Sequence, residues 1–125
     1  MKLILIVGIG SFIGGIIRYL LSVVIQAKTM TVFPYGTLSV NVIGCLLIGI
    51  VFGIADKGSM STEWKLLLAT GLLGGFTTFS TLSLETFNLI RLGHHLYAGI
   101  YVAVSIFVGL LATVIGVAAV RMLWG

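Results

Sequence analysis

The sequence predicts an all-α membrane protein with four transmembrane helices. Hydrophobic residues make up 59% of the 125 residues and charged residues only 8%, whereas a water-soluble domain carries about 25% charged residues. The apolar residues form four long runs, and a helix of about 20 apolar residues crosses the hydrocarbon core of a bilayer. The length leaves room only for short loops, so we expect one transmembrane domain over residues 1–125 in the cell membrane.

The first two spans are expected at residues 3–25 and 34–55. The first run is longer than the core of a signal peptide and has no Ala-x-Ala cleavage pattern, so we expect it to be retained. Within it Gly8, Gly10, Gly14 and Gly15 are spaced for close contact between helices, and Gly10 and Gly14 form a GxxxG pair, a spacing that lets helices pack closely in lipid. Pro34 suits the first turn of a helix and is expected to begin the second span.

The other two spans are expected at residues 64–90 and 96–124. Thr62 is a candidate N-cap for the third span, because a threonine hydroxyl can accept a hydrogen bond from the first turn. As one helix, residues 64–90 would be about 40 Å long at the usual rise per residue. That length exceeds the hydrocarbon core, so we predict that the third helix is broken in mid-membrane, near residues 74–78.

The residues from Gly71 to Glu85 form the most informative stretch of the chain. Three glycines, a series of hydroxyl side chains and a carboxylate lie there inside an apolar run. Lipid offers no hydrogen bonds, so these groups must face protein, water or an ion. Transporters hold ions at broken helices in mid-membrane. We therefore predict that this stretch is the functional centre.

The polar groups of the spans favour an anion as the transported species. Uncharged hydrogen-bond donors can replace the hydration shell of a small anion, and the ring of Phe79 has a positive edge that an anion can contact. A cation channel would more naturally carry rings of Asp or Glu, and only Glu85 fits that pattern. The candidate donors are Asn41, Thr77, Ser80, Thr81, Ser83, Tyr101 and Ser105.

Three polar residues each have two interpretations that the sequence leaves open. Arg18 either extends its side chain to the interface or faces an aqueous vestibule. Asn41, on the same helix face as Thr37, makes a helix-to-helix hydrogen bond, which is the commoner role, or lines a pore. Glu85 is either a vestibule residue that tunes ion entry or an interfacial carboxylate bonded to a helix.

Enzymatic activity and nucleic-acid binding find no support in the sequence. No carboxylates pair, no histidine neighbours a serine or cysteine, and no spacing suits a metal site. The single Cys45 lies in an apolar segment. Adjacent His94 and His95 cannot share a helix face, so we interpret them as interfacial residues. The basic residues are scattered rather than gathered on one face, which excludes a nucleic-acid surface.

The distribution of basic residues gives almost no orientation signal. Four spans place both termini on one side, together with the loop between spans two and three. The residues on that side are Lys2, Lys57, Lys65 and Arg121, against Arg18, Lys28 and Arg91 on the other. The positive-inside rule needs a clear bias, so we hypothesise that copies insert both ways and pair as antiparallel dimers. Four helices are also too few to enclose a hydrated path.

Several motifs together resemble the CrcB-type, or Fluc, family of fluoride channels. The resemblance covers essentially the whole chain, and the eight-residue motif Gly-Gly-Phe-Thr-Thr-Phe-Ser-Thr is quite specific. The other motifs would be weak alone. The matching residues are Gly14-Gly15 with Arg18-Tyr19, Pro34-Tyr35-Gly36-Thr37-Leu38 with Val40-Asn41 and Gly44, and Gly74-Gly75-Phe76-Thr77-Thr78-Phe79-Ser80-Thr81 with Glu85.

The resemblance implies a fluoride-selective channel that exports the ion passively from the cytoplasm and so confers fluoride resistance. It also implies a dual-topology dimer with two antiparallel pores. A structural sodium ion at the dimer centre would be held by the backbone carbonyls of Gly74 and Thr77. The fluoride pore would include Asn41, Phe79, Ser80, Thr81, Tyr101 and Ser105, with Arg18 and Glu85 at vestibules.

One position departs from the family pattern. The family usually has Phe-Ser-Thr-Phe where this chain has Phe79-Ser80-Thr81-Leu82. Leucine keeps the bulk of the second ring but loses its quadrupole. The partner in the dimer is therefore expected to be either a second copy or a paralogous subunit that supplies the missing ring.

The alternative function is a small dual-topology multidrug or cation transporter of similar size. Such transporters need a carboxylate in the first span to bind cationic drugs and protons. Here the first span carries Arg18 and no acidic residue, which favours the fluoride channel.

Overall fold

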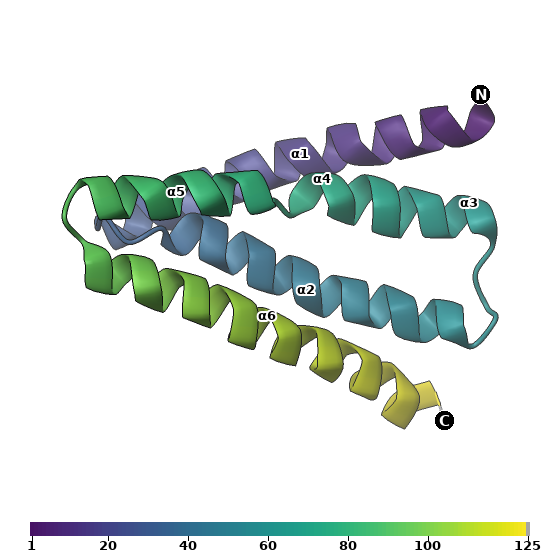
Figure 1. Ribbon diagram of the computed structural model, residues 1–125. Helices are drawn as coiled ribbons and strands as arrows, with labels where there is room; N and C mark the ends of the chain where they lie inside the picture. Colours follow the sequence, from purple (N-terminus) through teal and green to yellow (C-terminus); the bar gives the residue numbers. More distant parts are fainter. Residues whose placement is uncertain (125) are drawn as a thin grey trace.

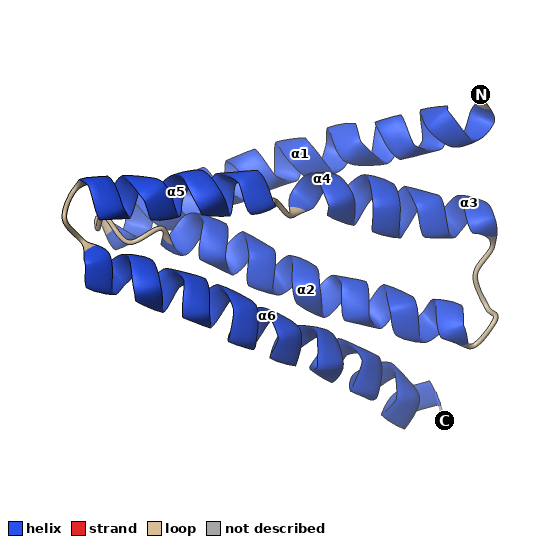
Figure 2. Cartoon of the chain, in the orientation of Figure 1, coloured by secondary structure: helices blue, strands red, loops and turns tan. Residues whose placement is uncertain are grey.

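The computed structural model describes residues 1–124 and contains only helices and loops over that range (Figures 1 and 2). Four helical spans are long and apolar enough to cross a membrane, as the sequence predicts. Three of them are single helices, and the third is divided into several segments. In chain order the elements are α1 (Lys2–Thr29), α2 (Tyr35–Asp56), α3 (Thr62–Lys65), η1 (Leu66–Leu73), α4 (Gly74–Phe76), α5 (Phe79–Arg91) and α6 (His95–Trp124).

The break in the third span lies where the sequence places it. Thr77 and Thr78 have extended backbones, with φ and ψ of −94° and 155° and of −153° and 127°. Upstream, η1 is a π-helix, a form that is rare and frequent at functional sites. Downstream, the Thr78 hydroxyl accepts a hydrogen bond from the Thr81 N–H at 3.2 Å and so caps α5.

The ends of two helices differ from the predictions. α1 continues to Thr29, beyond the predicted end of the span at residue 25, and Met30 ends it in a left-handed conformation with φ of 49°. The predicted cap at Thr62 is wrong. The Ser61 hydroxyl accepts from the Trp64 N–H at 3.3 Å, so Ser61 is the N-cap and Thr62 is the first helical residue. Either hydroxyl can serve this role, and only the backbone path selects one.

The helices pack in two pairs, which Figure 1 shows side by side. η1 and α4 lie along α1, and α6 lies along α2, while α5 leans on the start of α6. Gly10 and Gly14 are buried in the first pair, and a Cβ atom on Gly14 would overlap the Leu72 carbonyl oxygen. The predicted packing role is therefore confirmed for Gly10 and Gly14. It is not met within residues 1–124 of this chain at Gly8 and Gly15, where nothing lies within 4 Å of an added Cβ. Gly49 and Gly116 form the equivalent close contact between α2 and α6.

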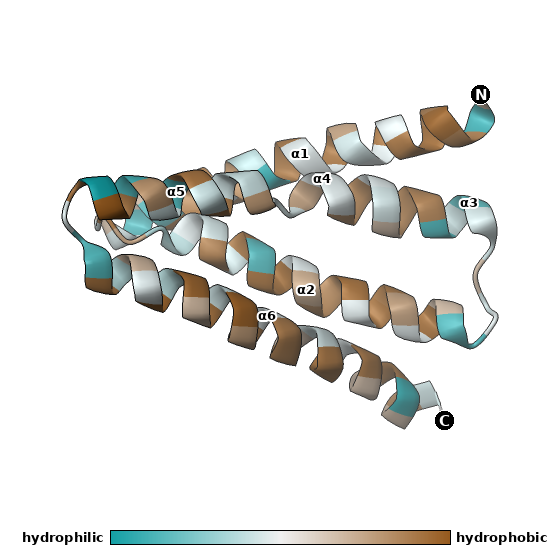
Figure 3. Cartoon of the chain, in the orientation of Figure 1, coloured by the Kyte–Doolittle hydropathy of each residue, from teal (hydrophilic) through white to brown (hydrophobic). Residues whose placement is uncertain are grey.

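Apolar residues predominate along all the long helices (Figure 3). Large side chains such as Phe12, Phe107 and Leu110 are exposed, which suits contact with lipid or with another chain. Hydrophilic residues gather mainly at the helix ends, where Arg121 and Asp56 approach to 3.9 Å. The fold therefore leaves few polar groups at membrane depth, and those few define the candidate site.

Candidate functional site

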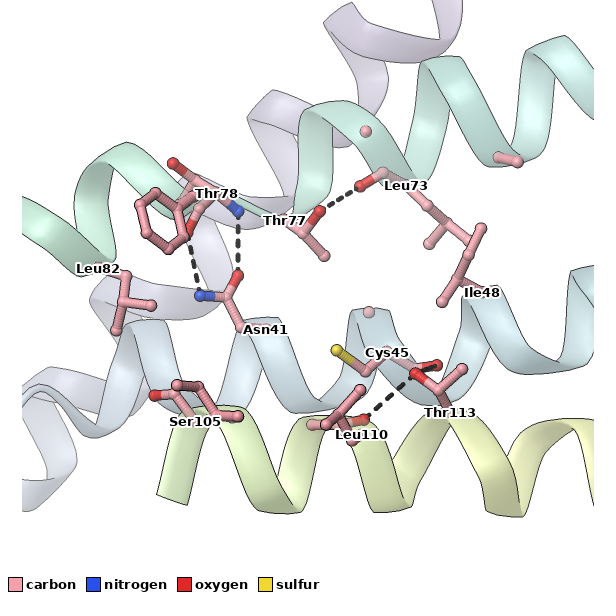
Figure 4. Close-up of a pocket in the computed structure, with 16 residues that line it drawn as sticks. Asn41, Cys45, Ile48, Leu73, Thr77, Thr78, Leu82, Ser105, Leu110 and Thr113 are labelled. Atoms are coloured by element: carbon pink, nitrogen blue, oxygen red, sulfur yellow. Dashed lines mark hydrogen bonds between the residues drawn. The ribbon is translucent and has the colours of Figure 1, made fainter. Parts of the chain in front are cut away.

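The break in the third span is held by Asn41 of α2 (Figure 4). The Asn41 Oδ1 accepts from the Thr78 N–H at 3.0 Å, and the Nδ2 donates to the Thr78 carbonyl at 3.2 Å. The Thr78 N–H, which the break removes from helical bonding, is thus paired by the Asn41 amide, as broken membrane helices require. The Thr78 carbonyl, at the N-cap of α5, gains a second donor from the same amide. The helix-to-helix bond, one of the two interpretations of Asn41, is present, and it reaches the stretch that the sequence predicts to be the functional centre.

Arg18 of α1 reaches the same region from the other side. Its Nε donates to the Gly75 carbonyl at 3.2 Å, an oxygen at the end of α4 that lacks a helical partner. The side chain is therefore directed to the break rather than along the helix toward the interface. The Thr77 hydroxyl adds a third bond, to the Leu73 carbonyl at 2.9 Å.

Two backbone carbonyl oxygens at the break, those of Gly74 and Thr77, accept no hydrogen bond outside the helices within residues 1–124. The Thr78 N–H, which would continue the helix to Gly74, goes to Asn41 instead. Over the same range no cluster of three or more acidic, histidine or cysteine side chains could hold a metal. A cation here would therefore depend on backbone oxygens, which hard cations accept.

A pocket of about 490 Å³ opens beside the break, between the third span and the α2–α6 pair (Figure 4). It gathers half of the predicted site residues: Asn41, Phe79 and Ser105 of the predicted pore, with Gly74 and Thr77 of the predicted sodium site. Apolar side chains such as Ile48 and Leu110 form the rest of the wall. The pocket thus combines an apolar lining with a few polar groups, which is typical of binding sites.

The remaining predicted site residues lie outside the lining of this pocket. Ser80 is exposed and its hydroxyl lies 3.1 Å from that of Thr78, while the Thr78 hydroxyl donates to the Thr81 hydroxyl at 3.3 Å. These three hydroxyls form one chain at the start of α5. Phe79, between them, is 80% exposed, so its ring is available to an ion or to another subunit.

Tyr101 and Ser105 lie one helical turn apart on α6. Tyr101 is fully buried, in a cluster with Phe33, Leu89 and Ala98. Among the described residues, neither the Tyr101 hydroxyl nor the Ser105 hydroxyl has a hydrogen-bond partner. Buried polar groups are rarely left unpaired. These two hydroxyls are four residues apart, so they lie on one face of α6 and are free to bond to a further group.

Glu85 is bonded to the neighbouring helix. The Thr37 hydroxyl of α2 donates to its carboxylate. Thr37 and Asn41 therefore face α5 together, as their spacing predicts. Glu85 is half-buried, and the bond from Thr37 connects its carboxylate on α5 to α2.

Two polar residues of the site were not singled out by the sequence. Thr78 supplies both backbone groups that Asn41 binds, and Thr113 lines the pocket with its hydroxyl donating to the Cys45 carbonyl at 3.1 Å. Thr113 continues the four-residue spacing of Tyr101 and Ser105 through Gly109. That spacing was the available signal, because residues four apart share a helix face.

Leu82 occupies the position of the second aromatic ring expected from the family pattern. It lines the pocket and also packs against the cluster of Phe33, Leu89, Ala98 and Tyr101. The pocket wall is therefore aliphatic at this point. Phe79 is the one aromatic residue of the segment from Phe79 to Leu82, and its ring is exposed.

Four apolar spans, with polar groups gathered at a break in the third, define a small multi-pass membrane protein. Its residues 5–117 match the family described as CrcB-like protein, Camphor Resistance (CrcB). The chain belongs to this family.

Several curated relatives are similar over nearly their whole length, and each is named fluoride-specific ion channel FluC. The protein from Flavobacterium psychrophilum is 43% identical over 90% of this chain and 92% of its own. That from Roseiflexus sp. is 44% identical over 96% and 98%. That from Oceanobacillus iheyensis is 45% identical over 94% and 90%.

Proposed function

We propose that this chain is a fluoride-selective channel that lets the ion leave the cytoplasm passively and so confers fluoride resistance. The observation that carries the proposal is the identity of 43–45%, over nine-tenths or more of the chain, with relatives that are named fluoride-specific channels. The site agrees in its chemistry, because neutral donors and an exposed ring surround a polar break in an apolar bundle. A transport role rather than an enzymatic one follows from the same relatives.

The proposed fluoride path follows the polar groups from the pocket to the start of α6. Asn41 and Ser105 would offer donors within the pocket, and Phe79 would meet the ion with its ring edge. The hydroxyls of Ser80, Thr81 and Tyr101 would extend the path. The unpaired hydroxyls on α6 support this assignment, since a small anion needs donors in place of its water.

Arg18 and Glu85 would act at the two margins of this path. The guanidinium of Arg18 carries a positive charge close to the break, which would favour an anion there. Glu85, held by Thr37, would modulate entry from the α5 side. Both assignments come from the family resemblance and fit the direction in which these side chains point.

We also propose that the working unit is an antiparallel dimer. The open pocket and the 80% exposure of Phe79 leave apolar and aromatic surface that a second subunit would cover. Because Leu82 replaces the second phenylalanine of the family pattern, the partner would be either a second copy of this chain or a paralogue that carries that phenylalanine. Labelling of termini in intact cells should find both termini accessible from each side of the membrane. A uniform orientation would exclude dual topology.

A structural sodium ion at the dimer centre would be bound by the carbonyls of Gly74 and Thr77 from both subunits. The fit rests on two oxygens without hydrogen bonds outside the helices at one break, in a region where no acidic cluster competes. This chain's own contribution is to hold the break open through Asn41 and Arg18. The ion would supply positive charge between the two subunits when bound.

The function is tested by fluoride efflux from liposomes that contain the purified protein. Valinomycin carries the compensating potassium, a fluoride electrode records release, and chloride-loaded liposomes serve as the matched control. We expect rapid fluoride release with chloride retained. Fluoride release no faster than from protein-free liposomes, with the protein alone and with a paralogue added, would reject the channel. The alternative multidrug transporter is not favoured, since α1 carries no acidic residue.

A further inference from the structure

The side-chain amide of Gln26 lies outside the candidate site and is fully used in hydrogen bonds. Gln26 is in the last turns of α1. Its Nε2 donates to the carbonyls of Thr31 at 2.8 Å and Phe33 at 2.9 Å, and its Oε1 accepts from the Gly36 N–H at 3.0 Å. One side chain therefore ties together α1, the connecting loop and the first turn of α2.

The backbone of Gln26 takes part in the same arrangement. Its carbonyl accepts from the Met30 N–H at 3.3 Å and from the Thr29 hydroxyl at 2.9 Å. Met30, in the left-handed conformation, turns the chain out of the helix. The loop thus has little freedom, because its carbonyls and the first free N–H of α2 are held by a residue of the preceding helix.

The bond from the Gln26 amide to the Phe33 carbonyl fixes the position of Phe33 and of its ring. Phe33 is only 7% exposed although it lies in a loop. Its ring centroid lies 5.7 Å from that of Tyr101 with the planes at 78°, and 5.8 Å from that of Tyr97 at 86°. Edge-to-face contacts of this kind are favourable and orient both rings. Phe33 therefore covers the Tyr101 ring from the loop side.

Tyr101 connects this cluster to the polar path. Its ring is fully buried against Phe33, Leu89 and Ala98. Its hydroxyl has no hydrogen-bond partner among the described residues, and Tyr101 lies one helical turn before Ser105 of the pocket lining. A fixed ring gives the orphan hydroxyl a fixed direction. Any movement of Phe33 would open the ring of Tyr101 to water and to rotation.

We propose that Gln26 is a positioning residue for the fluoride path, because it holds Phe33 over Tyr101 and so sets the direction of the Tyr101 hydroxyl. The inference rests on the proposed function in that Tyr101 is taken as part of the path. The chemistry needs an amide, since only an amide supplies two donors and one acceptor in this geometry.

The test compares Gln26→Leu, which removes all three side-chain bonds, with Thr29→Val as the matched control. Thr29 is exposed in the same turn, and its loss leaves the Gln26 carbonyl bonded to Met30. We expect Gln26→Leu to lower fluoride efflux about tenfold, and Thr29→Val to leave it at the wild-type rate. Efflux at the wild-type rate in Gln26→Leu would overturn the proposal.

A second readout follows the tyrosine itself. Protein labelled with 3-fluorotyrosine is examined by fluorine NMR, with the Tyr101 signal assigned through Tyr101→Phe. Gln26→Leu should shift or broaden that signal, and Thr29→Val should not. The double variant Gln26→Leu with Phe33→Ala should conduct no more slowly than Phe33→Ala alone. An unchanged Tyr101 signal, or additive losses, would overturn the route through Phe33.

A variant that keeps one of the three side-chain bonds serves as a control for misfolding. Gln26→Glu keeps the acceptor for Gly36 but loses both donors, and should change efflux and the Tyr101 signal in the same direction as Gln26→Leu. Wild-type values in a folded Gln26→Glu dimer would overturn the proposal. If the wild-type protein carries no fluoride, the proposed function fails, and the NMR comparison still decides whether Gln26 orients Tyr101.

Discussion

The two halves of the third span, before and after the break, behave as different kinds of helix. The first half, η1 and α4, packs its glycines against α1, so that a Cβ on Gly71 would lie 2.9 Å from the Val7 carbonyl and one on Gly75 2.6 Å from that of Ser11. The second half, α5, has one buried residue, Leu89, and presents Phe79 and hydroxyls outward. The first half of the span thus packs against α1, and the second half carries residues of the candidate site.

The break allows the two halves of the third span to pack against different helices. A continuous helix would carry its packing stripe along one line, whereas two extended residues let α4 lie on α1 and α5 lean on α6. The break in turn depends on Asn41 and Arg18. Substitutions at the contacts of the first half should therefore damage folding, and substitutions in the second half should damage transport alone.

The largest effect is expected for Gly14→Ala. A Cβ there would overlap the Leu72 carbonyl, and forcing extra volume into a packed contact costs about 1–3 kcal/mol. We expect a clear fall in melting temperature in detergent, together with loss of fluoride efflux. Gly8→Ala is the matched control, because nothing lies within 4 Å of its added Cβ. Equal melting temperatures for the two variants would contradict the scaffold role of the first half.

Asn41→Leu should come next, because it cuts the connection between the halves. The part-buried Thr78 N–H would lose its partner, at about 1–3 kcal/mol, while the Thr78 carbonyl would lose its second donor and keep the first bond of α5. We expect efflux to be abolished and melting to fall. Asn41→Asp keeps the acceptor for the Thr78 N–H and loses the donor, so its stability should lie between those of Asn41→Leu and the wild type. Wild-type efflux in Asn41→Leu would show that the amide is dispensable.

Phe79→Ile should separate transport from folding. The ring is 80% exposed, so its loss removes little packing within the subunit, while the positive ring edge is lost to the ion. We expect efflux to fall about tenfold or more with an unchanged melting temperature. Phe87→Ile, at another exposed ring of α5, should leave both quantities at wild-type values. Unchanged efflux in Phe79→Ile would remove this ring from the path.

Leu82→Phe should give the smallest change, and in the opposite direction. It restores the second ring of the family pattern at the pocket wall, and an aromatic contact is worth about 0.5–1.5 kcal/mol. We expect efflux by the protein alone to rise severalfold, with little change in melting. Leu84→Phe, at an exposed position nearby, is the control. A fall in efflux would indicate that the leucine is required in this chain.

The sequence was sufficient to predict the four spans and the place of the break. Both are local properties, since the length of an apolar run decides whether a helix crosses the bilayer, and glycines beside hydroxyl residues mark where a helix can open. The packing role of Gly10 and Gly14 followed from their spacing. The error at Thr62 also has a local cause, because Ser61 beside it has the same capping chemistry.

Only the tertiary structure decided which partner each polar group takes. Asn41 binds Thr78, Arg18 binds Gly75 and Thr37 binds Glu85, across sequence separations of 37, 57 and 48 residues. A hydrogen bond forms over about 3 Å, so it depends on how whole helices are placed and not on the pattern along any one of them. For the same reason the pocket beside the break, which no single segment contains, becomes visible only when the third span is laid against α2 and α6.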